Sequence, residues 1–195
     1  MKANLARVQK LESSFLSCEK DYETILKKLF IESQPHSDEL KRLLVINTND
    51  CMNKNNAYYN QVLKEYDLAT LKEKGYINVG PVTKHPESEE VKAYLTISMD
   101  NYTPNATNPH YRDCIVAFYI VTHTDYWDIG DYQIRPTKIA GYIDGLLDET
   151  KLSGIGVLNF LGFASTSMSN DFMLHTLTYT ATHGNDDIIS VEQNA

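Results

Sequence analysis

The sequence predicts an α+β protein in which a helical N-terminal region precedes an antiparallel ββ-α-ββ sheet packed on one helix. Up to residue 75 the apolar residues recur at helical spacing, whereas from residue 90 they alternate as in strands. One further segment with helical spacing separates two predicted strand pairs. We therefore expect a helical region over residues 1–75, an α+β domain over 76–183 and an acidic C-terminal tail over 184–195.

The first predicted helix, over about residues 4–31, carries a regular apolar stripe. Its members follow alternating steps of three and four positions, the heptad spacing of helices that pack along one another. They are Val8, Leu11, Phe15, Cys18, Tyr22, Ile25 and Leu29. The stripe can pack on the chain's own domain or on a neighbouring subunit, and the sequence leaves both open. In the second case the interface residues are Val8, Leu11, Phe15, Tyr22, Ile25 and Leu29.

Three shorter helices are expected before the sheet, over residues 39–46, 57–66 and 68–74. Asp67 is a suitable N-cap for the last of them, which Gly75 would end.

Four strands are expected in the second half of the chain. Residues 91–99 alternate between apolar and polar side chains, and residues 113–123 are apolar on both faces, which is typical of a central strand. A helix with one apolar face begins at Pro136. The second strand pair follows at residues 157–164 and 172–183.

Charge is unevenly distributed along the chain. Residues 1–75 carry 12 basic and 11 acidic side chains, a balance of +1, whereas residues 76–195 carry 6 basic and 15 acidic, a balance of −9. Tight binding of nucleic acid needs a cationic surface, so the second region is unsuited to it.

No apolar run is long enough to span a membrane. Of the three cysteines, Cys18 and Cys114 lie in apolar elements, and we expect small buried side chains rather than a disulfide framework.

Sequence motifs for catalysis, phosphate binding and zinc binding are missing, so we expect no enzyme, no catalytic residue, no cofactor and no metal. One alternative is a small metal-dependent hydrolase that uses His123, Asp125 and His175. The site would require these residues, from two strands, to converge.

The segment from residue 124 to 133 combines aromatic and acidic side chains. Tyr126, Trp127 and Tyr132 alternate there with three aspartates. Two of the carboxylates would serve as acid and base in an enzyme. The aromatic residues would instead anchor a protein interface, or a peptide or carbohydrate in a monomeric binding module. A third alternative is a loop that folds its own tryptophan onto the core.

Residues 131–147 carry a family resemblance. Arg135-Pro136, then Ile139, then Ile143-Asp144-Gly145-Leu146-Leu147, resemble a helix of the neck, tail-terminator and tail-completion proteins of tailed bacteriophages. In those families the helix lies between two strand pairs and precedes a glycine-containing link, as at residues 153–156. The resemblance covers about residues 90–183.

This resemblance implies a structural subunit of a closed homo-oligomeric ring at the head–tail junction. Its partners would be other copies of itself, the portal or an adjoining neck ring, and tail proteins, with DNA passing through the lumen without specific binding. The protein would be part of the virion and assembled in the host cytoplasm, with no membrane partner. The acidic region would line the channel through residues such as Asp144, Asp148 and Glu149. The alternative is that these acids only keep the surface soluble.

Overall fold

The computed structural model describes residues 18–33, 35–80, 92–108, 111–152 and 154–183. Its helices are α2 (Cys18–Lys27), the π-helical turn η1 (Lys28–Glu32), α3 (His36–Val45), α4 (Gln61–Glu65), α5 (Leu68–Glu73), the 3-10 turn η2 (Thr124–Tyr126) and α6 (Arg135–Leu147). Its strands are β1 (Ile77–Val79), β2 (Ala93–Pro104), β3 (Arg112–His123), β4 (Lys151–Leu152), β5 (Gly156–Val157), β6 (Asn159–Ser167) and β7 (Phe172–His183).

Over the described residues the main sheet has the order β1-β2-β3-β7-β6 and is antiparallel except for β1, which runs parallel to β2. The predicted α+β class and both predicted antiparallel pairs, β2 with β3 and β6 with β7, are confirmed. The prediction of four strands was incomplete, because β1 adds a fifth strand to this sheet and the short strands β4 and β5 pair as a separate two-stranded sheet. The three residues of β1 are too few to give an alternating pattern, and its position depends on pairing with β2 far along the chain.

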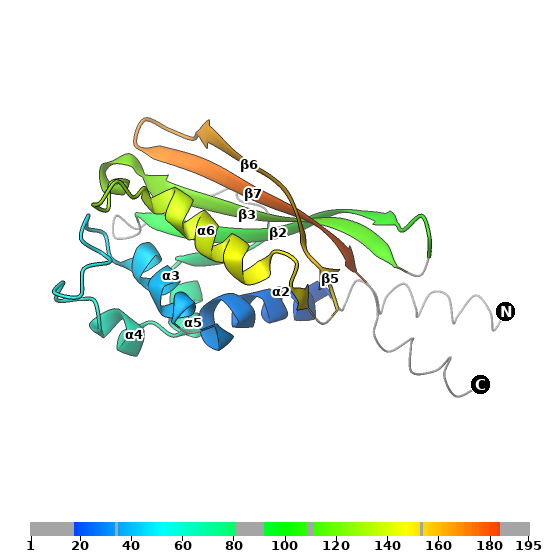
Figure 1. Cartoon of the computed structure of the whole chain (residues 1–195), viewed down its shortest axis with the longest axis horizontal. Helices are drawn as coiled ribbons and strands as arrows, with labels where there is room; N and C mark the ends of the chain where they lie inside the picture. The colour runs from blue at the N-terminus through cyan, green and yellow to red at the C-terminus, as the bar shows by residue number, and fades with distance from the viewer. Residues whose placement is uncertain (1–17, 34, 81–91, 109–110, 153, 184–195) are drawn as a thin grey trace.

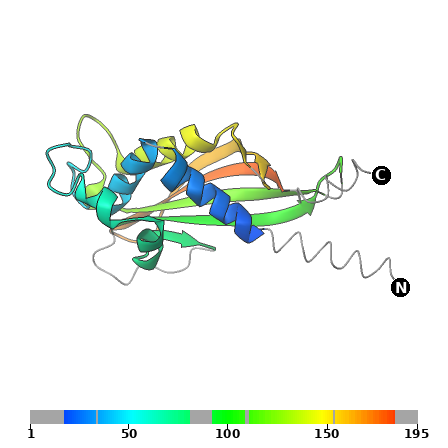
Figure 2. The ribbon, with the colours of Figure 1, turned by 90° about the horizontal axis from the view of Figure 1, so that it is seen from below.

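Helices α2, α3 and α6 lie across one face of this sheet (Figures 1 and 2). The strand register aligns the apolar residues of that face. Ile97, Phe118 and Leu177 follow one another across three strands, and all three are buried. The helices pack their apolar stripes against these rows. One continuous core results, containing residues from both sides of the predicted boundary at residue 75.

The described part of the first helix packs on the chain's own sheet. Ile25 and Leu29 are completely buried in the common core. The half-buried Tyr22 accepts a hydrogen bond of 2.9 Å at its hydroxyl from the backbone N–H of Met99. Of the two alternatives for the stripe, packing within the chain therefore holds for these three residues, and Ile25 and Leu29 have no surface left for a partner.

Several predictions made from the sequence concern parts of the chain outside the described residues. They are those for Val8, Leu11, Phe15, the side chain of Cys18 and the tail over residues 184–195. Cys114 is buried as predicted.

The short helices follow their local signals. The carboxylate of Asp67 accepts a hydrogen bond of 2.8 Å from the backbone N–H of Thr70, which confirms the predicted cap of α5. Helix α4 is shorter than predicted, with only five residues. None of the described helices is long and apolar enough to cross a membrane.

Candidate interaction surface

Arg135 fixes the loop that precedes α6. Its side chain is 1% exposed and donates hydrogen bonds to four backbone carbonyls. The acceptors are Leu43 (2.6 Å), Ile46 (2.9 Å), Thr48 (2.7 Å) and Tyr126 (2.8 Å). The first two lie at the C-terminal end of α3, where helix carbonyls lack partners and attract positive charge. Burial lowers the pKa of the guanidinium. Arg135 therefore joins three parts of the chain: α3, the loop over residues 126–134, here called the aromatic loop, and the start of α6.

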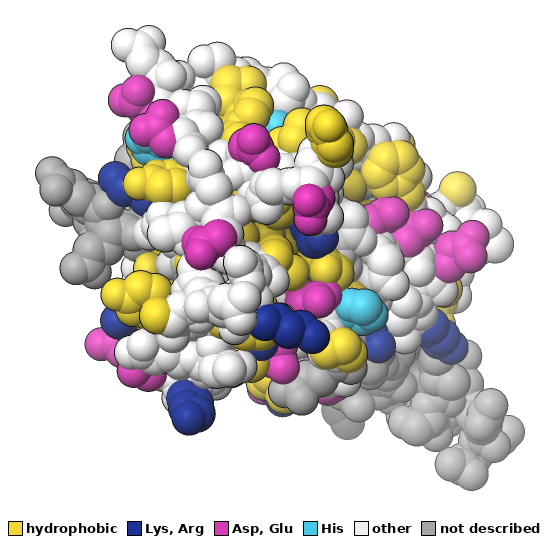
Figure 3. Space-filling view, turned by 60° about the vertical axis from the view of Figure 1, so that its left-hand side comes forward, with side chains coloured by type: hydrophobic (Ala, Val, Ile, Leu, Met, Phe, Trp, Pro, Cys, Tyr) yellow, Lys and Arg dark blue, Asp and Glu magenta, His cyan; other side chains and the backbone are white. Residues whose placement is uncertain are grey.

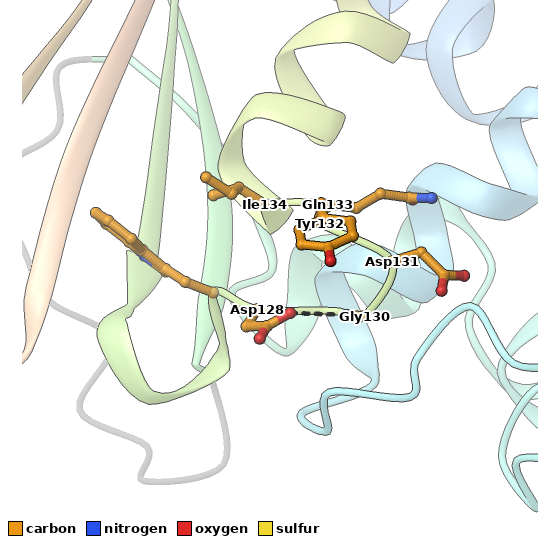
Figure 4. Close-up of a pocket in the computed structure, with 7 residues that line it drawn as sticks. Asp128, Gly130, Asp131, Tyr132, Gln133 and Ile134 are labelled. Atoms are coloured by element: carbon orange, nitrogen blue, oxygen red, sulfur yellow. Dashed lines mark hydrogen bonds between the residues drawn. The ribbon is translucent and has the colours of Figure 1, made fainter.

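The loop from Trp127 to Ile134 is a tight, strained turn (Figure 4). The backbone N–H of Gly130 donates to a carboxylate oxygen of Asp128 at 2.9 Å. The N–H of Ile129 donates to the carbonyl of Gln133, whose own N–H donates to the carbonyl of Gly130. Asp131 and Tyr132 are held at φ values of 50° and 59°, a left-handed conformation that costs a residue with a side chain about 1 kcal/mol or more.

The structure separates the three aromatic residues predicted for this loop. Trp127 is half-buried and donates a hydrogen bond of 2.8 Å from its indole N–H to the hydroxyl of Thr122, so it anchors the loop on the sheet. Tyr126 is also half-buried. Tyr132 has a relative exposure of 106%, so its ring is entirely in solvent. Of these three residues, only Tyr132 is as exposed as an interface anchor is expected to be.

A groove of about 660 Å³ lies along this loop. It is lined by Trp127, Asp128, Gly130, Asp131, Tyr132, Gln133 and Ile134. Ile134 is 49% exposed and contributes an apolar wall beside the rings, whereas Asp128 and Asp131 contribute carboxylates. In Figure 3, yellow hydrophobic side chains and magenta acidic side chains are interspersed over the molecular surface on this side.

The free edge of strand β6 is a second exposed apolar feature. In the described part of the chain no strand pairs with its outer edge. Phe160, Leu161 and Phe163 are 51%, 55% and 40% exposed. The nine residues of β6 include neither a charged residue nor proline, two features by which proteins usually protect an edge strand. A bulge between Phe160 and Gly162 gives this edge some protection.

His175 connects the loop to the β6 edge. Its ring lies 5.5 Å from that of Trp127 and stacks on Phe163 at 5.7 Å. His175 is 6% exposed, burial lowers its pKa, and its Nδ1 has no hydrogen-bond partner among the described residues. The groove and the β6 edge are therefore neighbouring parts of one surface.

The structure does not assemble the hydrolase site considered from the sequence. His175 pairs in register with Ile120 and His123 with Phe172, three positions along, so the two histidines point to opposite faces of the sheet. Asp125 is exposed and its backbone N–H donates to Nδ1 of His123. Within the described ranges no three His, Cys, Asp or Glu side chains cluster as metal ligands. Strand register, which the sequence did not give, decides this outcome.

Two of the acids considered for a channel wall are tied to the sheet. The hydroxyl of Tyr179 donates to Asp144 at 2.7 Å, and burial together with this contact raises the pKa of the tyrosine. Asp148 accepts a hydrogen bond of 3.1 Å from the backbone N–H of Phe160. Both carboxylates are half-buried, whereas Glu149 is exposed.

Comparison with known proteins identifies the family of this chain. The YomW family model matches residues 37–181, which is most of the chain. No curated protein matches. A chain from the virion of a native gene transfer agent particle has 19% identity and a TM-score of 0.37, with 66% of this chain and 92% of that chain covered. That likeness is too low to carry an argument.

The fold and the exposed surface define an α+β protein with a free sheet edge and a projecting aromatic loop. The chain belongs to the YomW family, which is a phage-type family.

Proposed function

We propose that this protein is a structural subunit of a ring in the phage neck, between the portal and the tail, and that it surrounds the DNA channel. Its role is assembly, with no catalytic step. The family membership supports the virion part of this proposal, and the helix over residues 135–147 supports the position in the neck.

The observation that carries the proposal is the outer edge of β6. An uncharged edge strand of nine residues with three exposed apolar side chains is an aggregation hazard in a monomer. A neighbouring subunit that covers the edge removes this hazard. Burial of apolar surface at about 25 cal/mol per Å² then contributes to assembly.

The charge of residues 76–195 supports the relation to DNA. A balance of −9 disfavours adhesion of phosphate at close range, where screening is incomplete. Because Asp144 and Asp148 each use a carboxylate oxygen inside the fold, Glu149 is the freest of the three proposed wall residues.

The test is the mass of the full-length protein in solution, by size-exclusion chromatography with light scattering, and its appearance by electron microscopy, alone and with portal protein. We expect rings in one of the two conditions. Phe163→Lys, which places a charge on the β6 edge, should reduce ring formation at least tenfold. The matched control is Val79→Lys, because Val79 is 42% exposed on the opposite edge of the sheet. A monomer that binds neither portal nor tail proteins refutes the proposal.

A second candidate function is a monomeric peptide- or carbohydrate-binding module, which the groove along residues 127–134 favours. It predicts a monomeric mass together with saturable binding at the groove. The same light-scattering measurement distinguishes it from a ring subunit.

A further inference from the structure

We propose that the groove along residues 127–134 is the docking site for residues 1–17 of a neighbouring copy of this chain. This inference rests on the proposed ring and names the two surfaces of one contact between its subunits.

The groove has the chemistry to bind an apolar segment with basic side chains. Tyr132 and Ile134 contribute exposed apolar side chains, and Trp127, which is anchored on the sheet, also lines the groove. Residues 124–134 contain three aspartates and neither lysine nor arginine, a balance of −3. Lys138 lines an adjoining hollow of about 370 Å³, where its amine donates a hydrogen bond to the side chain of Gln133.

The turn is also built to hold this surface in place. Asp131 and Tyr132 keep a left-handed backbone, which persists only where the surrounding structure enforces it. The bond from Gly130 to Asp128 and the four bonds of Arg135 supply that constraint. Because the backbone that carries Tyr132 is already fixed, the loop loses little conformational entropy when a partner covers it.

The charge and composition of residues 1–17 make them a suitable occupant of the groove. Residues 1–17 carry three basic side chains and one acidic side chain, a balance of +2. They include the apolar stripe residues Val8, Leu11 and Phe15. The segment is thus opposite in charge to the groove and offers apolar side chains for its wall. Even as a helix, 17 residues span about 25 Å, which is enough to reach into a neighbour.

The positions of the two surfaces favour a contact between copies. The loop over residues 127–134 lies at one end of the molecule, and the Cys18 end of α2 lies far from it along the long axis, toward the end formed by the tip of β2 and β3, in both ribbon views (Figures 1 and 2). When a segment that leaves one end docks on the opposite end of the next copy, the contact joins two different surfaces. Contacts of this head-to-tail type generate a ring when the rotation between neighbouring copies closes, which is the case that the proposed ring requires.

The test is cross-linking within the full-length assembly. A photoreactive phenylalanine replaces Tyr132, the protein is prepared as an equal mixture of ¹⁴N and ¹⁵N chains, and the cross-linked peptides are identified by mass spectrometry. We expect cross-links to residues 1–17, about half of them joining a ¹⁴N chain to a ¹⁵N chain. The matched control places the same group at Tyr58, which is 58% exposed and does not line the groove, and should not give these cross-links.

Charge reversal provides a second measurement. Asp128→Lys combined with Asp131→Lys should reduce the cross-linking yield at least fivefold, and adding Arg7→Glu and Lys10→Glu should restore it. Cross-links that join only chains of the same label, or that lead to other segments, overturn the inference even where light scattering still shows rings. A protein that stays monomeric with portal present and gives no cross-links overturns the proposed function and this inference together.

Discussion

Replacement of Arg135 by methionine is expected to lower the free energy of unfolding by about 3 kcal/mol. Methionine has a similar length and removes the charge, so the experiment isolates the four hydrogen bonds from packing. The carbonyls of Leu43 and Ile46 are fully buried and would lose their partner. Those of Thr48 and Tyr126 are partly buried and can be rehydrated.

The magnitude follows from the two buried carbonyls. Each unpaired buried acceptor costs about 1–3 kcal/mol, which gives about 2–6 kcal/mol for the pair. The loss is partly offset, because the variant no longer has to bury a charged group. A net value of about 3 kcal/mol corresponds to a fall of about 1.5 M in the urea midpoint at a slope of about 2 kcal/mol/M.

The assay is equilibrium urea unfolding followed by circular dichroism. Lys138→Met is the matched control, because Lys138 lies on the same helix but is half-exposed. We expect it to change stability by less than about 0.5 kcal/mol. If Arg135→Met loses less than about 1 kcal/mol with an unchanged urea slope, Arg135 does not stabilise the junction of α3, the aromatic loop and α6, and the reasoning is refuted.

Two further predictions concern the same surface. Tyr132→Gly is expected to raise stability by about 1 kcal/mol by relieving the left-handed backbone. Tyr132→Ala, which keeps the Cβ atom, should not raise it, and equal effects of the two in urea unfolding would contradict the strain. Because burial lowers the pKa of His175, the unfolded chain binds its proton more readily, so stability falls as the pH drops below about 6.5. His175→Gln should flatten the decrease measured between pH 7 and pH 5, and an unchanged slope would count against a buried neutral histidine.

Local patterns in the sequence determined most of the elements. The alternation over residues 91–99 and the apolar run over 113–123 predicted β2 and β3 because strand side chains alternate between faces. Asp67 predicted the cap of α5 and Pro136 the start of α6, since both act on the adjacent backbone. The missed strand β1 has only three residues, and its place depends on β2 rather than on any pattern of its own.

The tertiary structure decided which of the predicted site residues are available. The heptad stripe is the same whether Ile25 faces a partner or its own sheet, and only packing showed that it is buried in the chain's own core. Strand register placed His123 and His175 on opposite faces, although their residue types suit a metal site. The exposed edge at Phe163 follows from the strand order, because a strand is an edge only when no other strand takes its open side. The sequence by itself thus determined most of the elements and their order, which depend on neighbouring residues. Exposure, register and edge position depend on contacts between distant residues, and only the folded chain decided them.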